Sequence, residues 1–453
     1  MKEARTDFLL LDGRIVSETE NAALVIGEVR KSVHNPLFAE DRPWEVRFDN
    51  LYPNVVRNSS DGSYQCWYTL FIVDERTTNA PPSARASLNY MAVQPNARET
   101  GVCYAFSRDG IVWEKPELGL SGFEGSTKNN IVLRGPHGAG IFEDKHERNP
   151  SQRFKMLTRD DARTTMAVGF SANGLHWGPL AACSEIQAAG DTHNNALWVP
   201  ELGRYVGITR LWDAASRIRQ VGWTSSADFL SWSKATVILE GLEPHLQVYS
   251  MPVFRHAGLY LGLPAIYNRD TDRVHTELAW STDTLQWQRI CPGTPLIPNG
   301  VKGGYDWGCV YAGSSPIFLQ EGIRIYYGGS DGLHTSWRNG FFCLASLRPD
   351  GFAGYEPTHP DALGRVLTVP MRGSHDGLRV TADVREGGQV RVVAIDAGGN
   401  ELCSSGPITQ TVTKEPVSWK QGDVPLPGRA ARLLFELNRA RLYSFALGED
   451  TPV

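Results

Sequence analysis

The sequence predicts an all-β protein: a five-bladed β-propeller followed by a C-terminal β-sandwich. This prediction rests on two observations. A turn motif recurs at a spacing typical of propeller blades, and the pattern of apolar and polar residues changes after Thr358. The composition agrees, because 45 Gly, 27 Pro and 13 Trp are typical of many short strands joined by turns. A chain of 453 residues exceeds one ordinary core, so we expect a propeller over residues 1–358 and a sandwich over residues 359–453.

The recurring motif is a Ser, a short turn that often includes Asp or Asn, and a closing Trp. Its four clear copies are SRDGIVW, SANGLHW, SSADFLSW and STDTLQW. Their closing residues, Trp113, Trp177, Trp232 and Trp287, lie 64, 55 and 55 residues apart. A degenerate fifth copy, LRPDGFAGY, begins at Leu347. An alternating apolar strand precedes each copy, and repeats of this length are typical of propeller blades.

The last part of the chain alternates apolar and polar residues in LRVTADVREGGQVRVVAIDAGGNEL and again in ARLLFELNRARLYSFAL. Paired glycines at 387–388 and 398–399 mark hairpin turns between the predicted strands. This pattern predicts a small β-sandwich. Its expected core includes Leu433, Phe435, Leu437 and Tyr443.

Charge and apolar runs exclude several classes of protein. The net charge is −5 and neither sign is clustered, so nucleic acid is not an expected partner. The N-terminal apolar run, Phe8 to Leu11, is too short for a signal peptide, and no run is long enough to span a membrane. Seven cysteines without CxxC or zinc-site spacing predict a reduced, cytoplasmic protein, and no residue is assigned as a metal ligand.

The predicted architecture resembles glycoside hydrolase family 32, and its propeller alone resembles family 43. VRVVAIDAGGNEL and the following VSWKQGDVPLPGRAARLLFELNRARLYSFAL are similar to the family 32 sandwich over roughly residues 375–447. The family 32 motifs W-M-N-D-P-N-G, R-D-P and E-C-P are absent; the corresponding segments read FDNLYPNVV, GDTHNNALW and EPHLQVYSMPV. The resemblance implies a divergent glycosidase that needs no cofactor and acts on a terminal glycosidic bond of an oligosaccharide, for example a furanosidic bond.

The strand that opens each blade lines the central channel, so a ligand meets one end of that strand from every blade. Four of the five predicted openings carry an aspartate: Asp49, Asp144, Asp191 and Asp306. Converging carboxylates suit glycoside hydrolysis, in which one acid protonates the leaving oxygen and a second carboxylate attacks the sugar or activates water. An aspartate before a strand can also simply cap a turn.

By blade position, the resemblance to families 32 and 43 implies three catalytic roles. Asp49 would be the nucleophile or base, Asp191 the transition-state stabiliser and Glu243 the general acid. Seven further residues are predicted to bind substrate: Asp144, Asp306, His193, Trp307, Tyr249, Arg159 and Arg210. The histidine could instead be a core residue or hold a structural cation in the channel, and the aromatic rings could be core residues or platforms on which a sugar stacks.

Two alternatives to a hydrolase stay open. A non-catalytic sugar-binding propeller would need only one aspartate at the channel. A phosphorylase or transglycosidase could use the same pocket, and a phosphorylase would need basic residues close to the acids. Arg159 and Arg210, which follow the second predicted strands of blades 2 and 3, could supply them.

Overall fold

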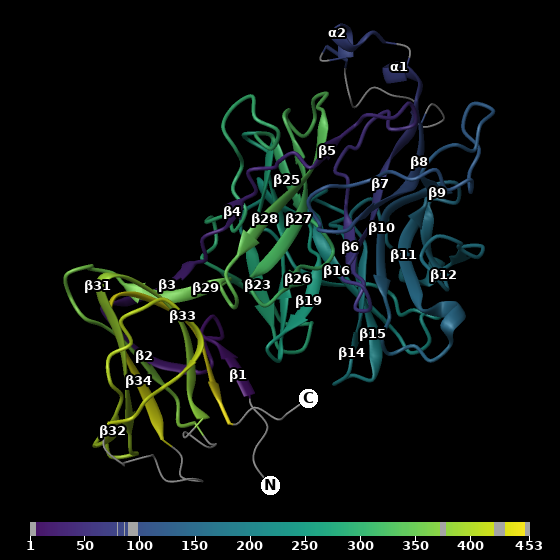
Figure 1. Ribbon diagram of the computed structural model, residues 1–453. Coiled ribbons are helices and arrows are strands. Elements are labelled where there is room, and N and C mark those ends of the chain that lie inside the picture. The colour runs from purple at the N-terminus through teal and green to yellow at the C-terminus, as the bar shows by residue number, and fades with distance from the viewer. Residues whose placement is uncertain are drawn as a thin grey trace.

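The computed structural model describes residues 6–78, 80–85, 87–88, 98–371, 377–420 and 431–448. The predicted all-β class is confirmed (Figure 1). The α-helices among these residues are α1 (Glu75–Thr78) and α2 (Pro82–Arg85), four residues each, which project beyond the end of one propeller strand. The 3-10 turns are η3 (Pro150–Gln152) and η4 (Ser184–Ile186).

Four separate antiparallel sheets of four strands each form much of the propeller. The first contains β6 (Asn54–Arg57), β7 (Tyr64–Asp74), β8 (Arg98–Ser107) and β9 (Ile131–Arg134). The second contains β10 (Pro136–Glu143), β11 (Phe154–Asp160), β12 (Thr165–Ser171) and β13 (Ala181–Ala182). The third contains β14 (Asn195–Val199), β15 (Arg204–Trp212), β16 (Arg219–Ser226) and β17 (Thr236–Leu239). The fourth contains β19 (Val253–His256), β20 (Leu259–Gly262), β23 (Leu278–Ser281) and β24 (Gln288–Ile290).

The remaining propeller strands share one nine-stranded sheet, so the predicted five separate blades are not confirmed. Its members are β4 (Arg30–Lys31), β5 (Phe38–Ala39), β18 (Leu246–Ser250), β21 (Ala265–Asn268), β22 (Arg273–Thr276), β25 (Cys309–Ala312), β26 (Ile317–Phe318), β27 (Ile323–Ser330) and β28 (Gly340–Leu347). A parallel bridge between Val274 of β22 and Cys309 of β25 joins strands that the repeat assigned to two blades. The early strands β4 and β5 pair with β28, so the start and the end of the propeller segment meet.

Hydrogen bonds explain the recurring turn motif. Ser107 Oγ accepts from the N–H of Gly110 at 2.8 Å, and Asp109 Oδ1 accepts from the N–H of Ile111 at 2.8 Å. Equivalent bonds to the Asp or Asn recur in the other three copies. The residue after the Asp or Asn has a positive φ in every copy, although it is glycine in only two; Phe229 and Thr284 take this place in the others. The motif is therefore a turn between the third and fourth strands of each repeat.

The C-terminal domain is a second nine-stranded sheet system that also includes the start of the chain. Its strands are β1 (Thr6–Leu9), β2 (Val16–Glu20), β3 (Ala22–Ile26), β29 (Ala353–Pro357), β30 (Gly364–Thr368), β31 (Arg379–Ile395), β32 (Glu401–Ser404), β33 (Val412–Pro416) and β34 (Arg432–Leu447). The predicted boundary at residue 358 is therefore wrong for β1 to β3 and for β29. Figure 1 shows these N-terminal strands within the C-terminal domain. The reason is pairing over long distances: β1 pairs with β34, and β3 pairs with β29.

The predicted core of this domain is largely confirmed. Leu433, Phe435 and Leu437 are fully buried in one apolar cluster. Tyr443 is also buried, but its hydroxyl donates to Asp383 at 2.7 Å and its ring lies 5.0 Å from the Arg348 guanidinium carbon. This tyrosine therefore contributes to the contact with the propeller.

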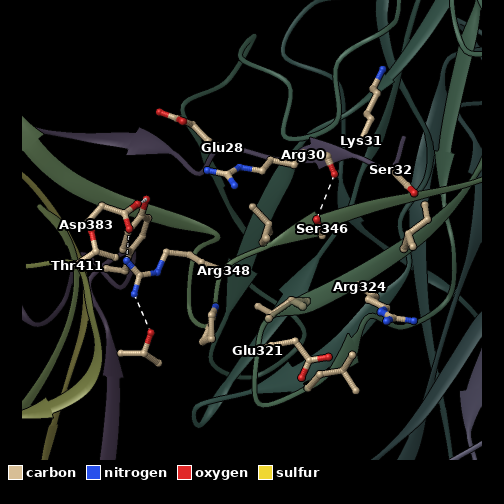
Figure 2. Close-up of a pocket in the computed structure, with 18 of the residues that line it drawn as sticks. Glu28, Arg30, Lys31, Ser32, Glu321, Arg324, Ser346, Arg348, Asp383 and Thr411 are labelled. Atoms are coloured by element: carbon tan, nitrogen blue, oxygen red, sulfur yellow. Dashed lines mark hydrogen bonds and ion pairs between the residues drawn. The ribbon is translucent and has the colours of Figure 1, made fainter. Parts of the chain in front are cut away.

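A cleft of about 640 Å³ lies between the propeller and the C-terminal domain (Figure 2). Arg348, directly after β28, reaches across to the carboxylate of Asp383 and donates to Thr413 Oγ at 3.0 Å. None of the site residues that the sequence predicts lines this cleft. The cleft is therefore part of the contact between the domains, and the predicted site residues lie elsewhere.

Candidate functional site

Three neighbouring inner strands bring acidic and basic groups to one mouth of the channel. Asp49 precedes β6, Asp191 precedes β14, and His137 is the second residue of β10, which lies between them in the chain. The negative charges of Asp191, Asp161 and Asp49 all act on the His137 imidazole. The structure therefore brings together two of the predicted catalytic aspartates.

Asp191 is held by two cations. His137 Nε2 lies 3.0 Å from Asp191 Oδ1, and Arg210 Nη1 lies 3.3 Å from Oδ2. Burial alone would raise the pKa of Asp191, but the hydrogen bond from His137 and the charge of Arg210 hold that pKa well below its ordinary value. The Asp191 side chain is still 48% exposed, so the ionised carboxylate can reach a ligand.

Asp191 faces a cavity of about 620 Å³. His137, Arg159, Asp161 and Phe71 also line this cavity. Arg159 Nε lies 2.8 Å from Asp161 Oδ1, so a second ion pair stands beside the first. The cavity thus combines carboxylates, guanidinium groups and one aromatic ring, a combination that suits a polar ligand with apolar faces.

Asp49 is held by the buried Arg338. Arg338 Nη2 donates to Asp49 Oδ1 and to Asn50 Oδ1, both at 2.9 Å. The backbone here is unusual, because Asp49, Leu51 and Tyr52 have φ values of 56°, 62° and 45°. Bulky residues rarely adopt this left-handed conformation, which is costly and is found mainly where the surrounding structure enforces it, often at functional sites.

Aromatic side chains fill the channel below these acids. The Tyr249 ring lies 4.0 Å from the Arg210 guanidinium carbon and 5.3 Å from the Tyr311 ring. His193 stacks on Tyr52 at 5.2 Å, and burial lowers its pKa to about 3. His193 Nε2 lies 3.1 Å from Asn54 Oδ1. His193 is therefore a neutral core histidine here, whereas Tyr249 lies against the site.

The expected convergence of Asp144 with the other aspartates is wrong. Asp144 follows the end of β10, whereas His137 stands near its beginning. Seven residues of extended strand span about 20 Å, so Asp144 lies near the opposite end of the channel. There it accepts from the Tyr205 hydroxyl at 2.6 Å and pairs with Lys155 at 2.9 Å.

Asp306 does precede its inner strand, β25, but its carboxylate faces another direction. It pairs with Lys31 at 2.6 Å and accepts from the Tyr327 hydroxyl at 2.8 Å. The neighbouring Trp307 uses its carbonyl to accept from Arg273 at 2.8 Å, with the Arg273 guanidinium carbon 5.3 Å from its ring. Both residues are thus occupied by contacts with other parts of the propeller.

Glu243 lies in the loop before β18, and its side chain is 63% exposed. Glu243 Oε2 lies 3.3 Å from His245 Nδ1. Among the described residues, no hydrogen bond or ion pair links Glu243 to Asp49, Asp191 or His137. The general-acid role of Glu243 thus stays a prediction.

Sequence reasoning missed His137, Asp161 and Arg338. The signal for His137 is the glycine pattern in PHGAGIF. A Cβ on Gly138 would lie 1.6 Å from the carbonyl oxygen of Thr192, and a Cβ on Gly140 would lie 1.8 Å from that of Asn194. These glycines therefore permit close approach of two inner segments near the channel axis, which identifies β10 as an inner strand.

Among the described residues, no group of three or more His, Cys, Asp or Glu side chains is arranged to hold a metal ion. No helix in this part of the chain is long and apolar enough to cross a membrane.

Replacing His137 with Gln should destabilise the protein more at pH 5.5 than at pH 8.5. Burial opposes the charge on His137, but the hydrogen bond to Asp191 and the nearby carboxylates raise its pKa. A raised histidine pKa stabilises the fold below its ordinary value of about 6.5, and this contribution is lost as the pH rises through the folded-state pKa. The lowered pKa of Asp191 keeps the partner ionised down to below about pH 4. Urea unfolding of both proteins at both pH values measures the difference; an equal loss at both would contradict the charged pair.

No known protein family and no curated protein matches this chain. Among the solved structures that it resembles is a β-1,2-mannobiose phosphorylase from Listeria innocua, with 14% identity, 71% of this chain and 97% of that chain covered, and a TM-score of 0.49. A glycosyl hydrolase from Bacteroides ovatus has 13% identity, coverages of 74% and 98%, and a TM-score of 0.47. An N-acetylgalactosamine deacetylase from F. plautii has 14% identity, coverages of 73% and 96%, and a TM-score of 0.46. At these identities and TM-scores the likeness decides neither family nor activity, and membership of family 32 or 43 is not confirmed.

Proposed function

We propose that this protein is a carbohydrate-active enzyme that hydrolyses a terminal glycosidic bond at the mouth of the propeller channel. The observation that carries the proposal is the pair of carboxylates at that mouth, Asp49 and Asp191, whose charges both act on His137. Glycoside hydrolysis typically uses two acidic groups on either side of the scissile bond, with a transition state that carries positive charge on the sugar. Two ionised carboxylates would stabilise that charge.

In this proposal Asp49 is the nucleophile or the base that activates water. The Arg338 contact at 2.9 Å favours the ionised carboxylate that either role needs. Asp191 stabilises the transition state, because its lowered pKa keeps it negative at all physiological pH values. The distance between the two carboxylates decides between retention and inversion of the sugar configuration.

For the proton donor, the geometry favours a different residue from the one that the sequence predicts. His137 has a raised pKa, lines the cavity and lies 3.0 Å from Asp191, so it can hold a proton beside a bound sugar. Glu243 is exposed at the rim and pairs with His245. We therefore propose His137 as the donor and retain Glu243 as the alternative.

Phosphorolysis is the second candidate reaction. Arg159 and Arg210 each lie beside a carboxylate of the site, Arg159 with Asp161 and Arg210 with Asp191. Guanidinium groups bind phosphate oxygens well, so Arg159, which lines the cavity, could hold inorganic phosphate as the attacking group in place of water, while the buried Arg210 adds positive charge nearby.

The test is an assay on a panel of aryl glycofuranosides and glycopyranosides, with and without inorganic phosphate. A hydrolase releases free sugar in both conditions, whereas release of a sugar 1-phosphate only with phosphate would identify a phosphorylase. His137→Gln should slow substrates with poor leaving groups far more than activated aryl glycosides, because an activated leaving group needs no proton. The same pattern in Glu243→Gln, but not in His137→Gln, would assign the proton to Glu243.

Sugar binding without turnover would contradict the proposed enzyme. If calorimetry detected binding of a glycoside that neither water nor phosphate cleaves in the presence of the protein, the channel would be a binding site only. Asp144→Asn is the matched control variant, since this buried aspartate lies near the opposite end of β10.

A further inference from the structure

A second cavity, of about 270 Å³, has three arginines in its lining: Arg217, Arg219 and Arg269. No described residue that lines it is an acid. Arg217 and Arg219 stand at the turn into β16, and Arg269 directly follows β21. Three positive charges around a small cavity without a lining carboxylate favour an anionic ligand.

Of the three arginines that line this cavity, Arg219 contacts three aromatic rings and makes a side-chain hydrogen bond. Its guanidinium carbon lies 4.6 Å from the Trp212 ring, 5.0 Å from the Tyr249 ring and 5.2 Å from the Tyr267 ring. Its Nη1 donates to Gln247 Oε1 at 2.8 Å. Aromatic contacts and this hydrogen bond together fix the plane of the guanidinium.

The charge of Arg219 is not neutralised by a neighbouring acid. Within the part of the chain that the structure describes, no carboxylate lies within ion-pair distance of Arg219, and its buried Nε has no hydrogen-bond partner. Burial and the charge of Arg210 lower the pKa of Arg219, which means that its positive charge is costly where it stands. An anion in the cavity would offset that cost.

One carboxylate lies beside the cavity without lining it. Asp272 accepts from the Tyr267 hydroxyl at 2.9 Å and from the Thr335 hydroxyl at 2.6 Å, and among the described residues it makes no ion pair with the three arginines. His334, which lines the cavity, is neutral, because burial and the charge of Arg338 hold its pKa well below the ordinary value. The cavity therefore keeps a net positive lining.

This arginine cluster adjoins the candidate active site. Arg219 and Arg210 both contact the ring of Tyr249, and Arg210 pairs with Asp191. A sugar bound against Asp191 could therefore carry a substituent toward Arg219.

We propose that Arg217, Arg219 and Arg269 bind an anionic group carried by the sugar substrate, either the carboxylate of a uronic acid or a sulfate ester. The inference rests on the proposed function for its location, and it names the class of substrate. One Nη group of Arg219 already donates to Gln247, so the anion would be held by the remaining guanidinium N–H groups of the three arginines that line the cavity, donors that suit a carboxylate or a sulfate.

The test is calorimetric titration of the full chain with glucuronate, galacturonate, glucose 6-sulfate, inorganic phosphate and neutral glucose and galactose. Acidic sugars should bind the wild type, and Arg219→Gln should weaken that binding about ten-fold or more, the usual consequence of losing a charge-assisted pair. Uronates and the sulfated sugar distinguish the two sources of the anion. Arg269→Gln, an exposed change in the same cavity, should weaken binding in the same direction and covers the case in which Arg219→Gln does not fold. Arg255→Gln is the matched control, because Arg255 is exposed and pairs with Glu201 elsewhere.

Equal binding of acidic and neutral sugars, or acidic-sugar affinity unchanged in both variants, would overturn the inference. Arginine-dependent binding of inorganic phosphate, with release of a sugar 1-phosphate, would also overturn it, because the cluster would then hold a co-substrate. Failure of the proposed function looks different: acidic sugars would still bind in an Arg219-dependent manner, but no glycoside would be cleaved.

Discussion

Asp49→Asn is expected to lower kcat by about 10³-fold or more while substrate binding is retained. The amide has the shape of the carboxylate and can still accept from Arg338, so the hydrogen bond should persist although the buried ion pair is lost and stability falls. The substitution removes the negative charge that attacks the sugar or activates water. A group that acts only in the transition state affects kcat and leaves ground-state binding intact.

Asp144→Asn provides the comparison for this experiment. Asp144 is also a buried aspartate of an inner-strand segment, with Tyr205 and Lys155 as partners. Its replacement should lower stability and leave the kcat of the folded protein close to that of the wild type. A kcat loss for Asp49→Asn no larger than that for Asp144→Asn would remove Asp49 from the chemistry.

Local features of the fold were predictable from the sequence. The turn motif makes its hydrogen bonds within a few residues, from Ser107 and Asp109 to the N–H groups that follow. The residues that form the turn are therefore close together in the sequence and can be recognised there, and the repetition of the motif predicts the propeller. Phe229 and Thr284 show the limit even here, because they occupy a left-handed position that the sequence pattern assigns to glycine.

Long-range pairing was not predictable in the same way. The alternation of residues in β1 and β3 indicates strands but carries no information about the strands with which they pair. Their partners, β34 and β29, lie more than three hundred residues away in the chain. The domain boundary predicted at residue 358, where the residue pattern changes, therefore left the N-terminal strands in the wrong domain.

The candidate site was predicted where the blade opening was identified correctly. Asp49 and Asp191 stand five and four residues before the short strands β6 and β14, and in the structure both charges act on His137. The prediction for Asp144 failed because Gly138 and Gly140 look like turn residues in the sequence. In the structure they lie in β10 and permit its close approach to the segment at Thr192 and Asn194. The prediction for Asp306 failed for another reason. Asp306 does precede an inner strand, but Lys31, from a distant part of the chain, pairs with its carboxylate.

Arg338→Met is expected to lower the free energy of unfolding by about 3–5 kcal/mol, the usual cost of removing one partner of a buried ion pair. Arg338 is fully buried, and the Asp49 side chain is only 10% exposed. Methionine fills much of the volume of the arginine stem, so the loss reports mainly on the ion pair with Asp49. Arg255→Met, which breaks an exposed pair with Glu201, should cost no more than about 1 kcal/mol.

The double variant Asp49→Asn/Arg338→Met separates charge from packing. When Asn replaces the carboxylate, removal of Arg338 no longer breaks an ion pair, so the two changes together should cost less than the sum of the single changes. Urea unfolding of the wild type, both single variants and the double variant measures this coupling. Strict additivity, or a loss for Arg338→Met as small as that for Arg255→Met, would show that the 2.9 Å contact does not hold Asp49 in its ionised form. The role of Asp49 as a ready nucleophile or base would then lose its physical basis.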